Sequence, residues 1–192
     1  MKAKIQVQCY HSPCGDFNAN SEVDMKAKIQ VQCYHSPCGD LLLGSFGDKL
    51  CLCNWVVEKH SGRIDRRLQT LLKAEYENAQ SDITCEAIRQ LNEYFRWERQ
   101  SFDMPLLLVG TEFQKRVWNR LLEIPYGETL SYGDMAQSLG IPKAVRAVAN
   151  ANGANAISLF VPCHRVIGSN GSLTGFGGGI EVKKFLLALE RQ

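Results

Sequence analysis

The chain of 192 residues lacks an apolar run long enough to cross a lipid bilayer. Residues 1–6 alternate polar and apolar side chains, whereas a secretory signal peptide has a continuous apolar segment. Excess charge of one sign is also absent, because the net charge is only +2 at pH 7. Overall charge therefore does not point to DNA, and a nucleic-acid site would have to come from local clusters. We expect a cytoplasmic protein that has no membrane partner.

Cysteine is plentiful, but the arrangements that usually give it a structural role are missing. Eight cysteines without a secretion signal are expected to be reduced thiols, and Cys51, Cys53 and Cys85 lie on apolar patterns typical of a core. The remaining candidates for zinc are two Cys-x4-Cys pairs with a histidine nearby. Structural zinc sites favour closer spacings such as Cys-x2-Cys, so we expect no metal and no cofactor. These pairs are Cys9 and Cys14 near His11, and Cys33 and Cys38 near His35.

An exact internal repeat opens the chain. Residues 1–16 recur without change as residues 25–40, and eight residues separate the two copies. Repeat proteins need several stacked units that usually vary, so we interpret the pair as a recent duplication or a cloning artefact. The second copy runs directly into the next apolar segments. We therefore expect a domain to begin at residue 25, and residues 1–24 to be a largely disordered extension.

Alternating and helical patterns predict an α+β first domain over residues 25–105. Alternation over residues 28–34, 41–46 and 49–57 predicts a three-stranded antiparallel sheet, with a hairpin at Gly47. A charged connector that ends at Pro105 marks the expected domain boundary. Helical spacing predicts two helices, one with Ile64, Leu68, Leu71 and Leu72 inward and one with Ile83, Ala87, Ile88, Leu91 and Phe95 inward.

The second domain, over residues 106–192, is predicted to be mostly helical. Thr111 and Gln114 form a capping box at the start of one helix, whose buried stripe is Phe113, Val117, Trp118, Leu121 and Leu122. Its last helix is expected to bury Val182, Phe185, Leu186 and Leu189.

Between these two helices the pattern predicts a helix-turn-helix. One helix starts at Ser131 and stops at Gly140, and the next follows Pro142 and closes at Gly153. A hairpin of helices packed for stability alone is the alternative. The second helix is slim and basic, which favours close approach to a nucleic-acid groove; its relevant residues are Lys143, Ala144, Arg146, Ala147, Ala149 and Ala151.

Residues 162–166, Pro-Cys-His-Arg-Val, contain the clearest candidate for chemistry. A thiol becomes a strong nucleophile as a thiolate, and a neighbouring base or cation such as His164 or Arg165 promotes that form. The alternative is that Cys163 is a buried structural thiol beside a satisfied histidine. The glycine-rich residues 175–179 lack the Lys-Ser/Thr that ends a phosphate-binding loop, so glycine here indicates close approach of backbone to a ligand.

This pentapeptide resembles the active-site signature of the O6-alkylguanine-DNA alkyltransferases, also called methylated-DNA–protein-cysteine methyltransferases. The resemblance extends from about residue 34 to residue 190 and is densest from residue 111 onward. It implies a ribonuclease H-like first domain and a winged-helix-like second domain, acting as a monomer on double-stranded DNA. It also implies repair by direct reversal, in which Cys163 takes a methyl or larger alkyl group irreversibly from O6-alkylguanine, and from O4-methylthymine as a further expected substrate.

The resemblance implies three sets of site residues. The first set carries the reaction: Glu190 orients His164, which deprotonates Cys163 through a water, and Tyr132 supplies a proton to the base. The second set contacts DNA: Arg146, Tyr132, Lys143, Ala144, Ala147 and Asn152. The second helix of the pair would lie in the minor groove, and Arg146 would take the place of the extruded base. The third lines the pocket, with phenylalanine at position 176 where many relatives carry tyrosine: Asn155, Val166, Phe176, Gly177 and Arg165.

Two other classes of protein compete with this interpretation. A cysteine hydrolase or thiol redox enzyme would use Cys163 and His164 as direct partners, which adjacent residues cannot easily be, and the site has no Cys-x-x-Cys. A non-catalytic lesion-binding module is the other class. Alkyltransferase-like lesion sensors lack the reactive cysteine, so the presence of Cys163 argues against it.

Overall fold

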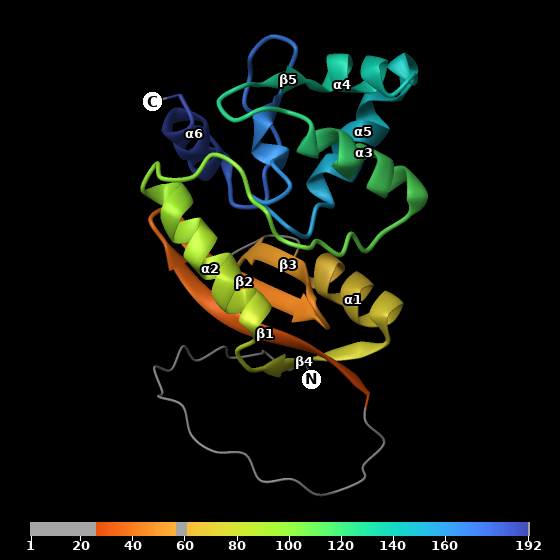
Figure 1. The fold of residues 1–192 in the computed structure, drawn as a ribbon. Coiled ribbons are helices and arrows are strands. Elements are labelled where there is room, and N and C mark those ends of the chain that lie inside the picture. Colours follow the sequence, from red (N-terminus) through yellow and green to blue (C-terminus); the bar gives the residue numbers. More distant parts are fainter. Residues whose placement is uncertain (1–25, 57–60, 192) are drawn as a thin grey trace, which may run out of the picture.

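The computed structural model describes residues 26–56 and 61–191. The first half is a four-stranded sheet in the order β3-β2-β1-β4 with helices packed on it (Figure 1). Strands β1, β2 and β3 form the predicted antiparallel meander, whereas β4 lies parallel to β1. The elements are β1 (Ala27–Ser36), β2 (Gly39–Phe46), β3 (Lys49–Trp55), α1 (Ser61–Leu72), β4 (Ala74–Asn78) and α2 (Asp82–Phe95).

The prediction of a three-stranded sheet was wrong by one strand. The sequence of β4, Ala-Glu-Tyr-Glu-Asn, is polar and has only Ala74 buried, so it lacks the alternation that reveals a half-buried strand. Its pairing is non-local, since Ala74 lies opposite Ala27 and helix α1 is needed to bring the strand back. A local pattern cannot show such a partner.

Over residues 106–191, the described part of the second half, the chain forms four α-helices, two short 3₁₀ turns and one small parallel ribbon. Thr111 caps α3 in the predicted capping box, and Ser131 caps α4 in a second box with Asp134. Gly140, with φ +74°, ends the turn after α4, and a 3₁₀ turn over Pro142–Ala144 leads into α5. The elements are α3 (Glu112–Leu122), β5 (Leu130–Ser131), α4 (Tyr132–Ser138), α5 (Val145–Gly153), β6 (Val166–Ile167) and α6 (Ile180–Leu189).

The outer strand β3 joins the two halves (Figure 1). The Cys53 N–H donates to the carbonyl of Ala156 at 2.8 Å, and the Ser158 N–H donates to the carbonyl of Cys53 at 2.7 Å. Leu50 pairs in a similar way with the chain around Leu106. These bonds satisfy the backbone groups of β3, and they fix the segment that leads to Cys163 against the sheet.

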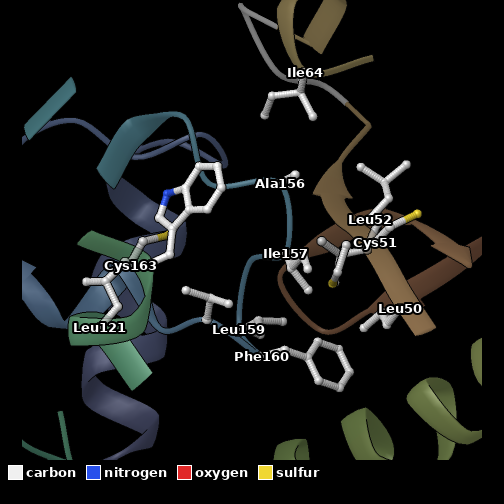
Figure 2. Packing of buried hydrophobic residues seen from close by; sticks show 14 of the residues in the cluster. Leu50, Cys51, Leu52, Ile64, Leu121, Ala156, Ile157, Leu159, Phe160 and Cys163 are labelled. Carbon is white, nitrogen blue, oxygen red and sulfur yellow. The ribbon is translucent and has the colours of Figure 1, made fainter. Parts of the chain in front are cut away.

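Buried side chains from both halves form one continuous hydrophobic cluster (Figure 2). Leu50, Cys51 and Leu52 of β3 share it with Ile157, Leu159 and Phe160 of the second half, and Cys163 lies at its edge. No helix in the described part of the chain is long and apolar enough to span a membrane.

Several predicted core positions face solvent instead. Cys85, Leu71, Leu122 and Phe185 are exposed, because each lies at the margin of its helix's apolar stripe rather than at its centre. In α6, Lys183 is buried together with Leu186, Leu187 and Leu189. The predicted extension over residues 1–24, including Cys9 and Cys14, and the end of the predicted third strand at residue 57 lie outside the described residues.

We predict that Gly44→Val destabilises the fold by overpacking. A Cβ at position 44 would lie 3.0 Å from the Leu52 Cβ and 3.3 Å from methyl carbons of Ile29 and Val31. Added methyl groups in such a packed interior cost about 2 kcal/mol of unfolding free energy. Denaturant unfolding measures this loss. Gly62→Ala, where a Cβ meets nothing within 4 Å, is the control and should keep or raise stability; equal stability of the two variants would contradict the prediction.

Candidate active site

Cys163 is positioned by a short, heavily bonded segment that follows α5. The Asn155 side chain donates to the Val161 carbonyl at 2.8 Å and accepts from the Ile157 N–H at 2.9 Å. Leu159 adopts φ +73°, a conformation that side chains other than glycine rarely take, so the turn is held by these bonds and by β3. Asn155 thus links the end of the helix pair to the reactive turn, which is a 3₁₀ turn over Cys163–Arg165.

The carboxylate of Glu190 is the centre of a buried polar cluster. Its Oε1 accepts hydrogen bonds from His164 Nε2 at 2.7 Å, from the Tyr94 hydroxyl at 2.7 Å and from Arg165 Nη2 at 3.0 Å. Its Oε2 accepts from Arg165 Nε at 2.8 Å and from the Gly127 N–H at 3.2 Å. Burial by itself raises the pKa of Glu190, but the hydrogen bonds and positive charges of His164 and Arg165 outweigh it and hold the pKa well below its ordinary value. Glu190 is therefore ionised.

His164 is fully buried and oriented as a base. Burial lowers its pKa against the opposing effect of Glu190, so the imidazole is neutral. With an ionised carboxylate on Nε2, the single ring proton belongs on Nε2. Nδ1 then carries a lone pair, and it makes no hydrogen bond to a protein group in the described part of the chain. The ring can accept one proton at Nδ1 while Glu190 stabilises the resulting charge.

Cys163 is 5% exposed and rests as a thiol. Burial raises its pKa, while contacts from Asn155 and Ser158 and the charge of Lys183 lower it. Nucleophilic use of this sulfur therefore requires a base, and His164 is the adjacent group with a free acceptor.

Lys183 is a functional candidate that the sequence pattern missed. Its ammonium group donates to the carbonyls of Val166 at 2.6 Å and Thr174 at 2.9 Å, and lies 5.9 Å from the centre of the Tyr132 ring. Burial lowers the pKa of Lys183, and the interaction with Cys163 raises it. The sequence pattern predicts a surface position for a lysine between Val182 and Lys184 in an amphipathic helix. No local signal therefore indicates that Lys183 is buried.

A small cavity lies beside Cys163. It is lined by groups from three parts of the chain, and its free volume of ≈ 10 Å³ is room for about one water molecule. Lining residues include Asn54 of β3, Asn152 and Asn155, Ser158, and Phe176 and Gly177 of the loop.

Trp55 of β3 supports the loop over this cavity. Its indole packs edge-on against Phe176 with ring centres 6.1 Å apart, and a Cβ on Gly178 would lie 2.7 Å from it. Gly178 is needed because a side chain there would displace the indole. Sequence analysis found no site residue in the first half of the chain, because β3 reads simply as a strand.

Two predicted pocket residues lie elsewhere. The guanidinium of Arg165 is directed to Glu190 and to the Ile124 carbonyl, at 2.6 Å, rather than to the cavity. Val166 is fully buried in the core cluster and is absent from the cavity lining. Both side chains point away from the cavity, because consecutive side chains of the 3₁₀ turn point in different directions. Asn155, Phe176 and Gly177, the other three residues of that set, line the cavity.

The helix pair presents the predicted slim basic face. Lys143, Arg146 and Ala147 are exposed and Ala144 is half-buried. The far side of α5 is fixed: Trp118 Nε1 donates to the Ala151 carbonyl at 2.8 Å, and Arg67 of α1 donates to the Ala154 carbonyl at 2.7 Å.

Tyr132 and Asn152 lie between this face and Cys163. The Tyr132 hydroxyl is 3.5 Å from both the Thr174 carbonyl and Asn152 Nδ2. Asn152, predicted to contact DNA, is instead 1% exposed and lines the cavity, because it lies on the inner side of α5. In the described residues, no three side chains of His, Cys, Asp or Glu come together as a metal site would require.

A buried cysteine next to a buried histidine–glutamate pair, beneath an exposed helix pair, is the arrangement expected of two-part α+β proteins that combine a surface for nucleic acid with a reactive thiol. Comparison with known proteins identifies the family within that class. The family model described as "6-O-methylguanine DNA methyltransferase, DNA binding domain" matches residues 112–192.

Named relatives extend this match. The methylated-DNA–protein-cysteine methyltransferase of Methanosarcina acetivorans is 60% identical over 105 residues, which are 55% of this chain and 67% of that protein. The constitutive enzyme of that name from Bacillus subtilis is 53% identical over 116 residues, or 60% and 70% of the two chains. A crystal structure of Mycobacterium tuberculosis OGT in complex with DNA has a TM-score of 0.71 at 43% identity, covering 85% of this chain and 92% of that one. The chain belongs to the methylated-DNA–protein-cysteine methyltransferase family.

We predict that Glu190→Gln lowers the free energy of unfolding by about 3 kcal/mol at pH 7, because it removes the anion that neutralises the buried Arg165. The loss should shrink in acid. The pKa of Glu190 is lower in the folded protein, so its stabilisation is present above its ordinary pKa of 4.5 and is lost as the pH falls below that value. Urea unfolding of both proteins between pH 3 and pH 7 measures this, and a pH-independent difference would contradict it.

We predict that Lys183→Met raises the pKa of the Cys163 thiol, because a positive charge that favours the thiolate is lost. Alkylation of Cys163 by iodoacetamide at pH 8, followed by peptide mass mapping, should slow several-fold. Lys184→Met, at the exposed neighbouring position, is the matched control and should react as the unmodified chain does. Equal alkylation rates of Cys163 in the two variants would show that Lys183 has no electrostatic role.

Proposed function

We propose that this protein repairs alkylated DNA by direct reversal, moving an alkyl group from the O6 oxygen of guanine to the sulfur of Cys163. The observation that carries the proposal is the buried Glu190–His164 pair, whose histidine follows Cys163 in the chain, together with the cavity that Cys163 lines beside an exposed helix pair. Membership of the family and the DNA complex of a 43% identical relative support it.

The reaction follows from the protonation states at the site. His164 Nδ1 takes the thiol proton, through one water in the cavity, while Glu190 holds Nε2–H and stabilises the imidazolium. The thiolate attacks the alkyl carbon of O6-alkylguanine from behind. The new S–C bond forms as the C–O bond breaks, and guanine leaves with the electron pair and regains a proton. A thioether is a very poor leaving group, so the thiol is not regenerated and each molecule acts once.

The helix pair would deliver the base. Lys143 and Arg146 supply positive charge, and the alanines at 144 and 147 leave α5 slim enough for the minor groove. The reacting base must leave the duplex stack to reach a buried sulfur, and the side chain of Arg146 would occupy its place.

Inside the pocket, Tyr132 and the loop would contact the base. The Tyr132 hydroxyl can donate to N3, and burial raises its pKa, so it stays protonated. Phe176 would provide an apolar wall and the backbone at Gly177 would approach the O6 side. O4-methylthymine is a second proposed substrate.

We propose the finer architecture on the same basis. The antiparallel meander with one parallel strand supports a ribonuclease H-like first domain over residues 25–105. The helix pair with its short ribbon supports a winged-helix-like second domain over residues 106–192. We propose a monomer that works in the cytoplasm, where reducing conditions keep Cys163 a free thiol.

Intact-protein mass after incubation with duplex DNA carrying one O6-methylguanine tests the proposed function. We expect a gain of one methyl group, saturating at one per protein and mapped to Cys163, and no gain for Cys163→Ser. DNA binding without methyl transfer would identify a lesion-binding protein instead. Methylation at another residue would refute the assignment of Cys163.

A further inference from the structure

Helix α1 of the first half carries a group of arginines that the reactive site does not use. Arg63, Arg66 and Arg67 lie in its first two turns. The single carboxylate of this helix is Asp65, which accepts a hydrogen bond from the Tyr76 hydroxyl at 2.9 Å. Within the part of the chain that the structure describes, no ion pair joins any of the three arginines to a carboxylate. The described residues therefore leave these positive charges without a counter-charge.

Helical spacing places two of these arginines on one side of α1. Arg63 and Arg67 are four residues apart, so they are neighbours on the helix surface. Ile64 and Leu68, which are 4% and 0% exposed, face the core. Arg63 and Arg66 are exposed, whereas Arg67 is half-buried. The helix thus presents two arginines to solvent and directs the third toward a neighbouring element.

That neighbour is the C-terminal end of α5. Helix α5 ends at Gly153, and the carbonyl of Ala154 accepts a hydrogen bond from Arg67 Nη2 at 2.7 Å. The same guanidinium lies 5.2 Å from the centre of the Trp118 ring, whose indole donates to the carbonyl of Ala151 at 2.8 Å. Figure 1 shows α1 below α3 and α5. These contacts hold α1 in a fixed place at the end of the helix assigned to the DNA groove.

The exposed face of α5 leads toward α1. Arg146, Asn150 and Gly153 are exposed and follow one another at spacings of four and three residues, so they form one stripe along the helix. A Cβ on Gly153 would meet nothing within 4 Å, so the end of this stripe is open. Helix α5 has no basic residue after Arg146. The arginines of α1 thus lie beyond the end of the stripe that has no charge of its own.

The dimensions of duplex DNA make this position useful. Helix α5 has nine residues, a length of roughly 13 Å. Duplex DNA carries one phosphate charge per about 1.7 Å of its axis, so the strands that border the groove present further phosphates past the end of so short a helix. A guanidinium group can bind phosphate oxygens through two parallel hydrogen bonds. Arg63 and Arg66 therefore have the chemistry that these phosphates require.

We propose that α1 is a second DNA-contacting element, in which Arg63 and Arg66 bind backbone phosphates beside the end of α5. The proposal rests on the proposed function, which places α5 on the duplex. Phosphate contacts carry no sequence information, so these arginines raise the affinity and fix the orientation of the protein on DNA. The first half of the chain, which supplies no reacting group, thereby takes part in DNA binding.

The salt dependence of DNA binding tests this role. Arg63→Gln combined with Arg66→Gln should weaken binding to a duplex without a lesion. The slope of log affinity against log salt should become shallower by about 1 for each lost contact, because each neutralised phosphate releases counterions. Fluorescence anisotropy of a labelled duplex over a series of KCl concentrations measures both quantities. Arg63→Lys with Arg66→Lys keeps the charges and should keep the slope. A glutamine pair with the slope of the unmodified chain would overturn the proposal.

The matched control removes the same amount of charge elsewhere. Arg96→Gln with Lys184→Gln changes two exposed residues, one at the end of α2 and one on α6, across the molecule from α1 (Figure 1). This control pair should keep the slope of the unmodified chain. Equal changes of slope in the two glutamine pairs would assign the effect to overall charge and refute the proposal.

The location of the contact is tested by hydroxyl-radical footprinting. Cys163→Ser bound to a duplex with one O6-methylguanine gives a complex whose register on DNA is set by the lesion. We expect protection of the backbone on one side of the lesion to disappear when Arg63 and Arg66 are replaced by glutamine in this chain, because α1 lies at one end of α5. Identical footprints with and without the two arginines would contradict a phosphate contact by α1.

Failure of this proposal is separable from failure of the proposed function. Methyl transfer by the unmodified chain, with a glutamine pair that binds DNA as the control pair does, would refute the role of α1 alone. Absence of methyl transfer would refute the proposed function, whereas a salt slope that depends on Arg63 and Arg66 would still support the DNA contact. If circular dichroism shows that the glutamine pair does not fold, Arg66→Gln alone should reduce the slope by about 1, and an unchanged slope would overturn the proposal.

Discussion

The buried carboxylate of Glu190 is the interaction on which the site depends. A single ionised group accepts five hydrogen bonds, from His164, Tyr94, the Gly127 backbone and twice from Arg165. An isolated charge in this interior would be unstable, so the partners and the carboxylate require one another. Because the donors come from α2, the loop after α3 and the reactive turn, the same interaction that orients the histidine also holds three segments of the chain together.

A second constraint joins the sheet to the chemistry. Strand β3 bonds to the segment after α5 through the backbone of Cys53, and Asn155 bonds across the turn that follows. The next residues of β3, Asn54 and Trp55, reach the cavity and the loop above it. The first half of the chain thus forms part of the wall of the site, although every reacting group that we propose lies in the second half.

Much of the fold and of the site was predictable where short-range patterns control the outcome. The meander, the capping box at Thr111 and the helix pair were predicted correctly, because their signals lie within a few residues. The fourth strand was missed because its partner is β1, far away in sequence. Cys85 and Phe185 were wrongly predicted to be buried. Helical spacing shows which face of a helix is apolar, but it does not show how wide the buried part of that face is. Arg165 and Asn152 were assigned to the wrong surroundings because their partners come from other elements.

By itself the sequence determined the family, and it predicted the nucleophile, its histidine and the slim basic helix, because each of these signals lies in consecutive or regularly spaced residues. Only the tertiary structure decided that Lys183 is buried near Cys163 and that Tyr94 and Arg165 share Glu190. It also decided that Asn152 is buried beside Cys163 and lines the cavity. The physical reason is that burial and hydrogen-bond partnership depend on which distant elements pack together: Tyr94 and Glu190 are 96 residues apart in the chain and 2.7 Å apart in space.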